Sequence, residues 1–420
     1  MDEGMIMVEE AQARILGRVR ETEIETVAAW EAVGRPLALD IAADIDLAPF
    51  ASSAMDGYAV RSADLAGAAP EHPVVLDVVG HEAAGSVIER EVGTGTAVRI
   101  MTGALVPEGA DAVVKYEVVD IVEGDGNEGS RVSFSAPARP GENVREPGLE
   151  ARSGEVVMAA GEVVTAAGAG LLASAGHPEV PVHRSPRVAV ISVGSELVEP
   201  SAVPDRGQIR DANASVLMAQ ALEAGAAPEF LGIVPDEEEA IAAVLRDACA
   251  AYDLVITSGG ASAGDYDYIE RIVADAGEIV FDRVSMKPGK AITFGMVGQT
   301  PFLGLSGNPA AAFMGFEMLA RPAIRKMLGY PSSTRPVQRA RVTHDVRKRQ
   351  ARRFFDRATV ERDEATGELT VTAAPSQNSA LLGTIHRSNA LLVVPDGPDG
   401  YAAGDEVDVV RFDLPEGAVL

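Results

Sequence analysis

Hydrophobic residues between positions 187 and 330 fall into short runs that alternate with amphipathic stretches. The runs that are typical of buried strands are residues 187–193, 230–234, 253–257, 279–284 and 301–305. Between the second and third runs, residues 237–251 carry apolar side chains at helical spacing, namely Ile241, Val244, Leu245, Ala248 and Cys249. This alternation predicts an α/β domain with a mostly parallel sheet and helices on both faces.

The rest of the chain shows different patterns. Residues 5–46, with Ala-rich and acidic turns, predict a helical region, and the Gly- and Ala-rich residues 145–178 are expected to return and pack on it. Residues 51–144 carry short Val- and Ile-rich runs split by Gly and Pro, which predict a small β-rich domain. Alternating runs after a linker at 331–336 predict a last, all-β domain.

Composition narrows the classes of function. A chain of 420 residues is expected to form two to four domains. The single Cys249 excludes an intrachain disulfide and a multi-thiolate metal site, and six scattered histidines disfavour zinc. The net charge of −27 disfavours nucleic acid and anionic membranes. The acidic N-terminus shows no secretory signal, and the longest nearly uncharged stretch, 163–176, is too short to cross a bilayer. A reducing cytoplasm fits these features.

Unusual chemistry follows the strands of the predicted sheet, where ligands of open parallel sheets bind. The tight turn Gly194-Ser195-Glu196 places a carboxylate after the first strand. The Gly-rich segment 258–267 follows the third strand and leads into a helix, so its backbone amides are suited to phosphate. Asp265 and Asp267 at its end suit a hard cation such as Mg²⁺.

Two further segments are suited to anions. Lys287-Pro288-Gly289-Lys290 holds two ammonium groups on a stiff turn, which favours a compact oxyanion. Ser306-Gly307-Asn308-Pro309 precedes a helix, with Asn308 as the expected N-cap and Pro309 as the first helical residue. Four such segments at one sheet edge point to a binding site more strongly than any one of them.

Each signal also has an ordinary interpretation. A Gly-rich loop often only turns the chain, and Asp236 with Glu239 is as easily a helix capping box as a site. The basic cluster 347–353 is typical of a solvated face, and Cys249 lies on the apolar stripe of its helix. The match of residues 168–173 to a dinucleotide fingerprint lies outside the βαβ region and favours chance. The chain contains no Walker A pattern.

Taken together, these motifs resemble one family over nearly the whole chain: the molybdopterin molybdenumtransferases of the MoeA type, whose eukaryotic relative is the gephyrin E domain. The motifs that carry the resemblance are MDGYA at 55–59, RIMTGA at 99–104, GENVR at 141–145, SGGASAGDYD at 258–267, KPGK at 287–290 and GNP at 307–309. This combination of motifs is highly specific for the family.

The resemblance implies four domains and a homodimer. A helical dimerisation domain is expected from residues 1–46 and 145–178, an inserted β-rich domain from 47–144, a central MogA-like three-layer α/β domain from 179–330, and a C-terminal β-barrel-like domain from 331–420. The active cleft is then expected between the inserted domain of one chain and the central and C-terminal domains of the other.

The family inserts molybdate into adenylyl-molybdopterin, releases AMP and uses a divalent cation, here expected to be Mg²⁺. Matched by motif, the expected catalytic residues are Asp56, Thr102, Glu196, Asp236 and Asp267. The expected substrate-binding residues are Ser258, Gly259, Gly260, Lys287, Lys290, Ser306, Gly307, Asn308, Pro309 and Arg352. Among them Lys287 and Lys290 match the molybdate-holding lysines and Arg352 matches an oxyanion-contacting arginine. The oxygen ligands expected for magnesium are Glu196, Asp236, Asp265 and Asp267.

The chain departs from the family around the oxyanion pocket. Ser306 and Ala291 stand where proline is usual, Ala311 replaces a frequent serine, and residues 377–379 lack the usual glycines. Ser306 is expected to supply the hydroxyl that Ala311 lacks.

Two other functions compete with molybdate insertion. The central domain also resembles molybdopterin adenylyltransferases, which use ATP but lack the inserted and C-terminal domains. A gephyrin-like scaffold is the other alternative, and the intact acidic and basic site residues argue against it. The sequence leaves open a preference for tungstate, the existence of paralogues, and contacts with other cofactor-synthesis proteins or a downstream apoenzyme.

Overall fold

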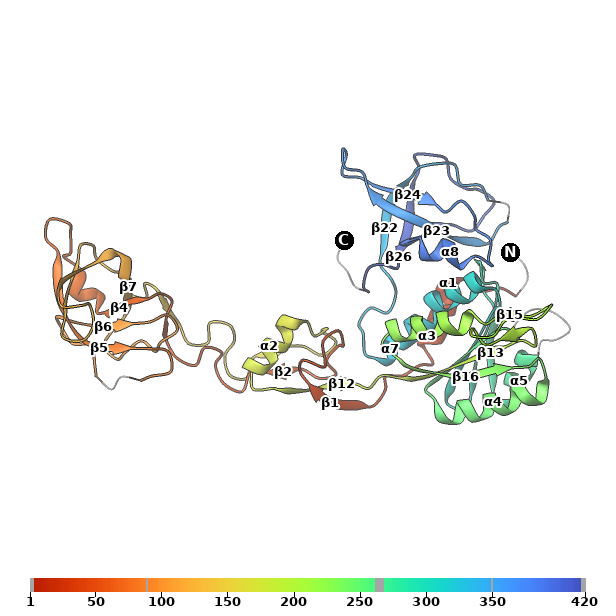
Figure 1. Cartoon of the computed structure of the whole chain (residues 1–420), viewed down its shortest axis with the longest axis horizontal. Coiled ribbons are helices and arrows are strands. Elements are labelled where there is room, and N and C mark those ends of the chain that lie inside the picture. The colour runs from red at the N-terminus through yellow and green to blue at the C-terminus, as the bar shows by residue number, and fades with distance from the viewer. Residues whose placement is uncertain (1–3, 88–89, 261–267, 349, 417–420) are drawn as a thin grey trace.

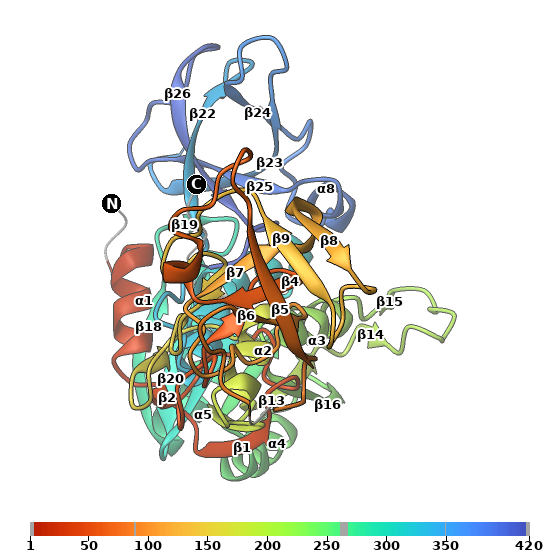
Figure 2. The same cartoon turned by 90° about the vertical axis from the view of Figure 1, so that its left-hand side faces the viewer.

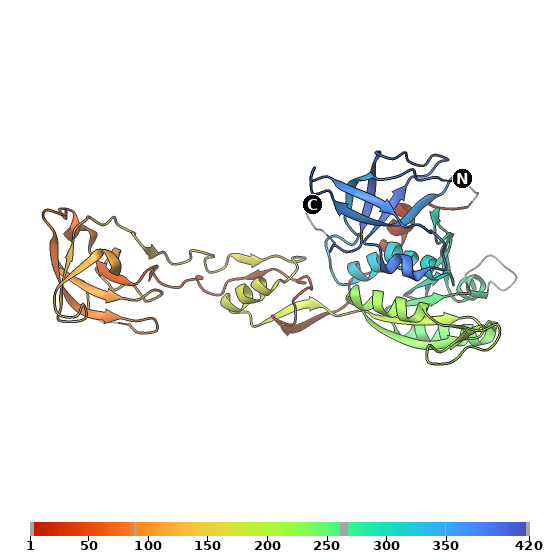
Figure 3. The same cartoon turned by 45° about the horizontal axis from the view of Figure 1, so that its top comes forward.

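The protein is elongated, with its domains arranged along one line (Figures 1 and 3). The computed structural model describes residues 4–87, 90–260, 268–348 and 350–416. An inserted β domain lies at one end, a narrow domain lies in the middle, and the central α/β domain lies at the other end beside the C-terminal β domain. Figure 2 looks along this line, with the inserted domain in front.

The central domain contains a six-stranded sheet in the order β16-β13-β17-β21-β20-β18. Its strands are β13 (Arg187–Val193), β16 (Ala227–Val234), β17 (Leu254–Ser258), β18 (Glu278–Arg283), β20 (Ala291–Val297) and β21 (Thr300–Leu305). Strands β16, β13, β17 and β21 are parallel, and β20 is antiparallel to both of its neighbours. Strand β18 therefore runs in the same direction as β21, so its carboxyl end lies at the same edge. The mostly parallel sheet and its five expected strands are confirmed.

The sequence prediction missed strand β20. It forms a hairpin with β21 through Gly298 and Gln299, and Gly298 has a φ of +63°. A two-residue turn of this kind needs a left-handed backbone that glycine adopts easily. Because the expected alternation was strand–helix–strand, no strand was predicted directly before 301–305.

Helices cover both faces of the central sheet and make three layers. The helices are α1 (Val8–Leu16), α3 (Asn213–Glu223), α4 (Glu238–Ala251), α5 (Tyr268–Ala276), α6 (Pro309–Gly315), the π-helical turn η3 (Phe316–Ala320) and α7 (Arg321–Met327). One core joins the sheet to α1, α3, α6, η3 and α7, and a second joins it to α4 and α5. Cys249 lies in the second core, and burial raises the pKa of its thiol to about 11, so its expected core position is confirmed.

The helical prediction for residues 5–46 is wrong beyond the first helix. Only α1 is helical, and it packs on the central sheet. Residues Ile24–Ala28 form β1, which pairs with β12 (Glu179–His183). The Ala content of this region suggested helix, but the β-branched residues of IETVA favour a strand when a partner strand is present.

The middle domain holds three more elements, β2 (Ile41–Ala42), β11 (Val156–Met158) and α2 (Ala166–Ser174). Strands β2 and β11 pair with each other, and β1 pairs with β12, so two antiparallel ribbons carry the chain to and from the inserted domain. Residues 168–173 lie within α2 rather than in a strand-to-helix loop, so their dinucleotide-like pattern forms no phosphate loop.

The inserted domain is β-rich, as predicted. Its sheet has the order β7-β4-β6-β5-β9-β8. The strands are β4 (Gly57–Val60), β5 (Val74–Glu82), β6 (Thr96–Ile100), β7 (Ala112–Lys115), β8 (Val119–Glu123) and β9 (Arg131–Phe134). Short elements flank it, namely β3 (Ser52–Ser53), η1 (Ser62–Leu65), η2 (Tyr116–Val118) and β10 (Val144–Arg145). The fully buried Tyr58 donates from its hydroxyl to the carbonyl oxygen of Gly126 at 2.9 Å.

The C-terminal domain is a closed β-barrel. Its strands are β22 (Val337–Val342), β23 (Arg353–Arg362), β24 (Leu369–Ala373), β25 (Ala390–Val394) and β26 (Glu406–Arg411), with the short helix α8 (Leu382–His386). Strand β23 pairs with both β24 and β25, which closes the ring, and β19 (Met286–Lys287) of the central domain adds to β23. The predicted final β domain is therefore confirmed. In the part of the chain that the structure describes, no helix is long and apolar enough to cross a membrane.

Candidate functional site

The carboxyl ends of β13, β17 and β21 open into one cavity of about 490 Å³. Two glycine loops pack against each other there. The backbone N–H of Gly259 donates to the carbonyl oxygen of Leu305 at 3.0 Å, and its φ is +89°. A Cβ at this position would lie 2.1 Å from the carbonyl oxygen of Val193, so only glycine fits. A Cβ on Gly307 would lie 3.6 Å from the Gly259 Cα, which places the two loops in contact.

Two of the expected acidic residues lie together in this cavity. The Asp236 carboxylate accepts from the Ser195 backbone N–H at 2.8 Å, and the Ser195 hydroxyl accepts from the Asp236 N–H at 3.0 Å. Glu196, the next residue, also lines the cavity. Helix α4 begins at Glu238 with Glu237 as its N-cap and without a side-chain cap. The capping-box interpretation of Asp236 is therefore wrong.

The remaining acidic residues of the prediction, Asp265 and Asp267, lie outside the described residues. Among residues 4–87, 90–260, 268–348 and 350–416, no three His, Cys, Asp or Glu side chains gather as a metal site. Ser258, Gly259 and Gly260 at the start of the loop are described, and all three line the cavity.

Sequence analysis missed one residue at the centre of this cavity, Asn213. It is the first residue of α3 and is 8% exposed. Its side-chain nitrogen donates to the Ser258 hydroxyl at 2.7 Å and to the Gly307 carbonyl at 2.9 Å. An asparagine at a helix start suggests a cap from sequence alone, but here Ala212 is the N-cap. The signal that could have found it is that the helix after β15 (Ile209–Arg210) starts beside the same sheet edge.

The lysine turn lies where the central and C-terminal domains meet. Lys287 of β19 pairs with Phe354 of β23, and its ammonium lies 4.3 Å from the centre of the Phe354 ring. The Arg352 guanidinium donates to the Met286 carbonyl at 3.4 Å. The structure thus brings Arg352 beside the turn. The backbone carbonyl of Lys290 accepts from the Val284 N–H at 3.0 Å, which closes the turn on the end of β18.

The start of α6 has the expected geometry. Asn308 is the N-cap and Pro309 follows it, although the Asn308 side chain makes no cap hydrogen bond. The Ser306 hydroxyl accepts from the Asn308 N–H at 3.4 Å. The Ala310 N–H donates to the Ser379 carbonyl at 2.8 Å, so the segment 377–379 of the barrel touches this helix start. The departures from the family pattern at Ser306 and at 377–379 therefore lie side by side.

Asp56 and Thr102 form a separate pair in the inserted domain. One Asp56 carboxylate oxygen accepts from the Thr102 N–H at 2.7 Å and from the Thr102 hydroxyl at 2.8 Å. These bonds, the backbone one first, lower the pKa of the exposed Asp56. Figure 1 shows β4 and β6, which flank the pair, at the opposite end of the chain from β13. One chain does not bring this pair to the cavity.

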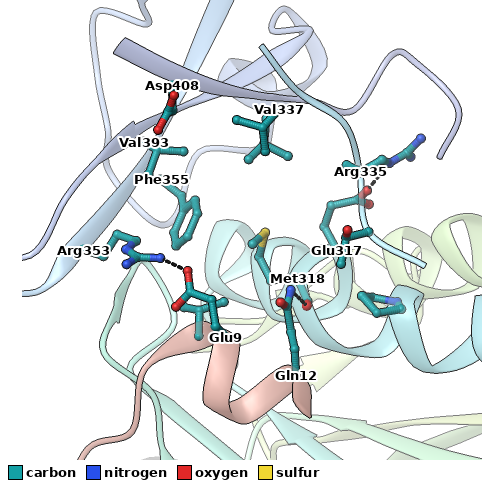
Figure 4. A pocket seen from close by; sticks show the side chains of 14 residues that line it. Glu9, Gln12, Glu317, Met318, Arg335, Val337, Arg353, Phe355, Val393 and Asp408 are labelled. Carbon is teal, nitrogen blue, oxygen red and sulfur yellow. Dashed lines mark hydrogen bonds and ion pairs between the residues drawn. The ribbon is translucent and has the colours of Figure 1, made fainter. Parts of the chain in front are cut away.

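A second cavity of about 240 Å³ lies between α1, η3 and the barrel (Figure 4). Its charged side chains are already paired, since Arg353 donates to Glu9 and Arg335 donates to Glu317 at 2.6 Å. None of the described residues of the predicted site lines it. The glycine-loop cavity is therefore the candidate site.

Comparison with known families matches three regions of the chain. Residues 6–176 match the MoeA N-terminal region (domains I and II), residues 189–326 match a probable molybdopterin binding domain, and residues 339–412 match the MoeA C-terminal region (domain IV). The fold and the glycine-loop cavity therefore define a multidomain protein of the MoeA class.

Whole-chain relatives identify the family. The molybdopterin molybdenumtransferase of Bacillus subtilis (strain 168) is 38% identical over 96% of this chain and 94% of its own, and that of Staphylococcus aureus (strain COL) is 35% identical over 96% and 95%. The crystal structure of the molybdopterin biosynthesis moea protein from Pyrococcus horikosii has a TM-score of 0.84 at 30% identity, covering 97% of this chain and 99% of that one. The chain belongs to the molybdopterin molybdenumtransferase family.

Proposed function

We propose that the protein inserts molybdate into adenylyl-molybdopterin and releases AMP to form the molybdenum cofactor. The observation that carries the proposal is the cavity at the carboxyl edge of the central sheet, where the glycine loop after β17 meets the start of α6. The relatives named molybdenumtransferase span the whole chain, including the inserted and barrel domains. This favours molybdate insertion over adenylyl transfer from ATP and over a scaffold without activity.

The glycine loop is proposed to hold the phosphates of the nucleotide. The Gly259 N–H is already bonded to Leu305, so among the described residues of the loop, 258–260, the donors left for a phosphate are the Gly260 N–H and the Ser258 hydroxyl. Backbone amides at a strand-to-loop turn are suited to anions because they carry partial positive charge without any need for a lysine. An anion can bind here although the protein has a net charge of −27, because the donors are fixed and lie close to the bound anion.

Molybdate is proposed to bind near Lys287, Lys290 and Arg352, against the start of α6. Charge-assisted hydrogen bonds from ammonium and guanidinium groups are the strong contacts available to a dianion. The pairing of β19 with β23 fixes Lys287 against the barrel, and the contact of Arg352 with Met286 holds the guanidinium beside it. Molybdate thus contacts donors from two domains, while the pterin sulfurs form the new bonds to molybdenum.

Glu196 and Asp236, together with Asp265 and Asp267, are proposed to hold Mg²⁺. The two described carboxylates fit a hard cation, because both line the cavity and are oxygen donors. When bound, the cation would stabilise the negative charge on the departing AMP. The chain's own part is to hold Asp236 in place through Ser195.

The magnesium assignment is tested with Asp236→Asn, which removes the charge but keeps an oxygen that accepts from Ser195. We expect the magnesium concentration for half-maximal rate to rise about 10-fold, with most of the rate recovered at high magnesium. Glu239→Gln, at an exposed position in the first turn of α4, is the matched control. An unchanged magnesium dependence in Asp236→Asn contradicts the assignment.

The active unit is proposed to be a cytoplasmic homodimer in which the inserted domain of one chain completes the MogA-like central domain of the other. The separation of Asp56 and Thr102 from the cavity supports this, because both sets of residues match the family's important positions. The middle domain also exposes several large apolar side chains, which a second copy would cover. They are Ile24, Trp30, Val33, Leu39, Ile45, Leu149 and Val156. Other cofactor-synthesis proteins are proposed as further partners, whereas nucleic acid and membranes are not expected.

The function is tested by supplying adenylyl-molybdopterin, molybdate and Mg²⁺ and measuring release of AMP together with formation of molybdenum cofactor. We expect both products in equal amounts. A parallel reaction with molybdopterin and ATP tests adenylyl transfer. Products only in the second reaction, or in neither, contradict the proposal.

A further inference from the structure

Asn213 connects two loops from a buried position on α3. Its side-chain nitrogen carries two hydrogens, and each has a partner: the Ser258 oxygen at 2.7 Å and the Gly307 carbonyl oxygen at 2.9 Å. Asn213 and Ser258 are 8% and 3% exposed, yet both line the cavity. The amide is therefore fixed at the point where the loop after β17 meets the loop after β21.

The identity of the second partner fixes the direction of the first hydrogen bond. The Gly307 carbonyl can only accept, so the amide must present its nitrogen, and not its oxygen, to both loops. Ser258 must then accept from Asn213, and the hydrogen of its own hydroxyl is not used in this contact. Among the described residues, no acceptor for that hydrogen is found. A hydroxyl that has accepted one bond and lines a cavity is ready to donate into it.

The oxygen of the Asn213 amide bears the cost of this orientation. It is buried and has no hydrogen-bond partner among the described residues. An unpaired buried acceptor is unfavourable, and the Gln220 amide of the same helix also has one. At Asn213 the unpaired oxygen accompanies two N–H donors that both bond to loops of the cavity.

We propose that Asn213 is a positioning residue that orients the Ser258 hydroxyl as a hydrogen-bond donor to a phosphate oxygen of the substrate. This inference rests on the proposed function, since it assigns a nucleotide phosphate to the glycine loop. Asn213 itself does not touch the substrate; it acts through Ser258. The hydroxyl then adds a neutral donor beside the Gly260 N–H, where a phosphate would otherwise meet the nearby carboxylates Glu196 and Asp236.

The test uses the full-length protein and AMP as the binding probe, measured by calorimetry, alongside turnover with adenylyl-molybdopterin. Ser258→Ala removes a hydrogen bond to a charged group, so the Kd for AMP should rise roughly 10- to 150-fold. Asn213→Ala should raise it about 10-fold, because the hydroxyl is then free to turn away. The double variant should differ from Ser258→Ala by less than about 2-fold. The KM for the pterin nucleotide should follow the Kd, while half-saturation by molybdate stays constant.

Two further variants separate positioning from stability. Asn213→Asp keeps the shape of the side chain, but its carboxylate has no N–H donors and takes the Ser258 hydrogen for itself, so AMP binding should weaken at least as much as in Asn213→Ala. Gln220→Ala removes another buried amide of α3, which donates to the Phe313 carbonyl at 3.2 Å away from the cavity. It should lower the melting temperature and leave the Kd for AMP unchanged.

The outcomes distinguish this inference from the function it rests on. If wild-type protein binds AMP and turns over, but Asn213→Ala and Asn213→Asp bind AMP normally, the positioning role is overturned and the function stands. Additive losses in the double variant also overturn it, because Asn213 would then act without Ser258. If wild-type protein neither binds AMP nor turns over, both proposals fail.

Discussion

The two parts of the proposed site are built in different ways. At the edge of the central sheet, glycine loops touch, an amide is buried, and lysine and arginine side chains are held between two domains. In the inserted domain, Asp56 is exposed and depends on one residue, Thr102. A rigid, buried half and an exposed half that is distant in the same chain fit a site that is completed by a second copy.

The largest expected effect is the loss of activity in two single variants and its recovery when the two variant chains are mixed. Asp56→Asn and Glu196→Gln should each lower turnover by at least about 100-fold, because each removes a charge that acts in the transition state. If the site is shared between chains, mixing the two variants under subunit exchange leaves one intact site in each mixed dimer. Random pairing should then restore about a quarter of wild-type activity.

The matched control is Asp56→Asn mixed with itself through the same exchange procedure, which should stay inactive. Sedimentation at micromolar concentration that gives only a 43.7 kDa species would contradict the shared site. So would a mixture of Asp56→Asn and Glu196→Gln that stays inactive although mixed dimers form.

The next effect concerns the lysine turn, which belongs to the rigid half. Lys290→Ala removes one charge-assisted contact, so the molybdate concentration for half-maximal rate should rise roughly 10- to 150-fold. Binding of AMP should change much less, since the phosphates are assigned to the glycine loop. An equal loss for both ligands, measured in the same variant, would show that the two anions do not use separate groups.

A smaller effect is expected on stability from Asp356, which lies on β23 near the lysine turn. Burial, opposed by Arg357 and Lys287, raises the pKa of this carboxyl from 3.8 to about 6. A raised pKa means that the folded protein binds the proton more tightly than the unfolded chain. The contribution of Asp356 to stability is therefore fully present below pH 4 and is lost as the pH rises through 6, by about 3 kcal/mol.

Asp356→Asn should remove this loss. We expect the variant to melt a few degrees above wild-type protein at pH 8 and at about the same temperature at pH 4. Asp363→Asn, at an exposed turn of the same barrel, gives the matched control, because the pKa of Asp363 is lowered by its bonds to Thr366 and Ala365 rather than raised by burial. A constant difference between Asp356→Asn and wild-type protein at all pH values would contradict the assignment.

Sequence reasoning located the loops of the rigid half because parallel strands place their carboxyl ends at one edge. Gly259 and Gly307 follow strands that are almost entirely apolar, so both the strand ends and the loops were evident. The residues that it missed act through partners distant in the chain. Asn213 gains its role from Ser258 and Gly307, and Asp356 from its burial beside β19, and neither contact leaves a local pattern.

The fold shows the same division. Most strands with a continuous apolar run were predicted, with β20 as the exception, whereas residues 24–28 become a strand only because β12 lies beside them. Propensity of a short segment is weak when a tertiary partner decides its structure. The separation of the inserted domain from the cavity of its own chain was expected only from the family resemblance, because no local pattern encodes it.

The smallest expected effect tests the exposed half directly, by the ionisation of Asp56. In wild-type protein the Thr102 N–H, followed by the Thr102 hydroxyl, lowers the pKa of Asp56. Thr102→Ala removes the hydroxyl but keeps the backbone donor, so the pKa should move upward, only part of the way to its usual value. Titration of the Asp56 carboxyl carbon by NMR measures this. Thr102→Ser keeps both donors and should leave the pKa low. If Asp56 instead titrated identically in Thr102→Ala and wild-type protein, the Thr102 hydroxyl would contribute nothing to the lowered pKa. The pKa of Asp56 would then be lowered by the backbone N–H of Thr102 alone.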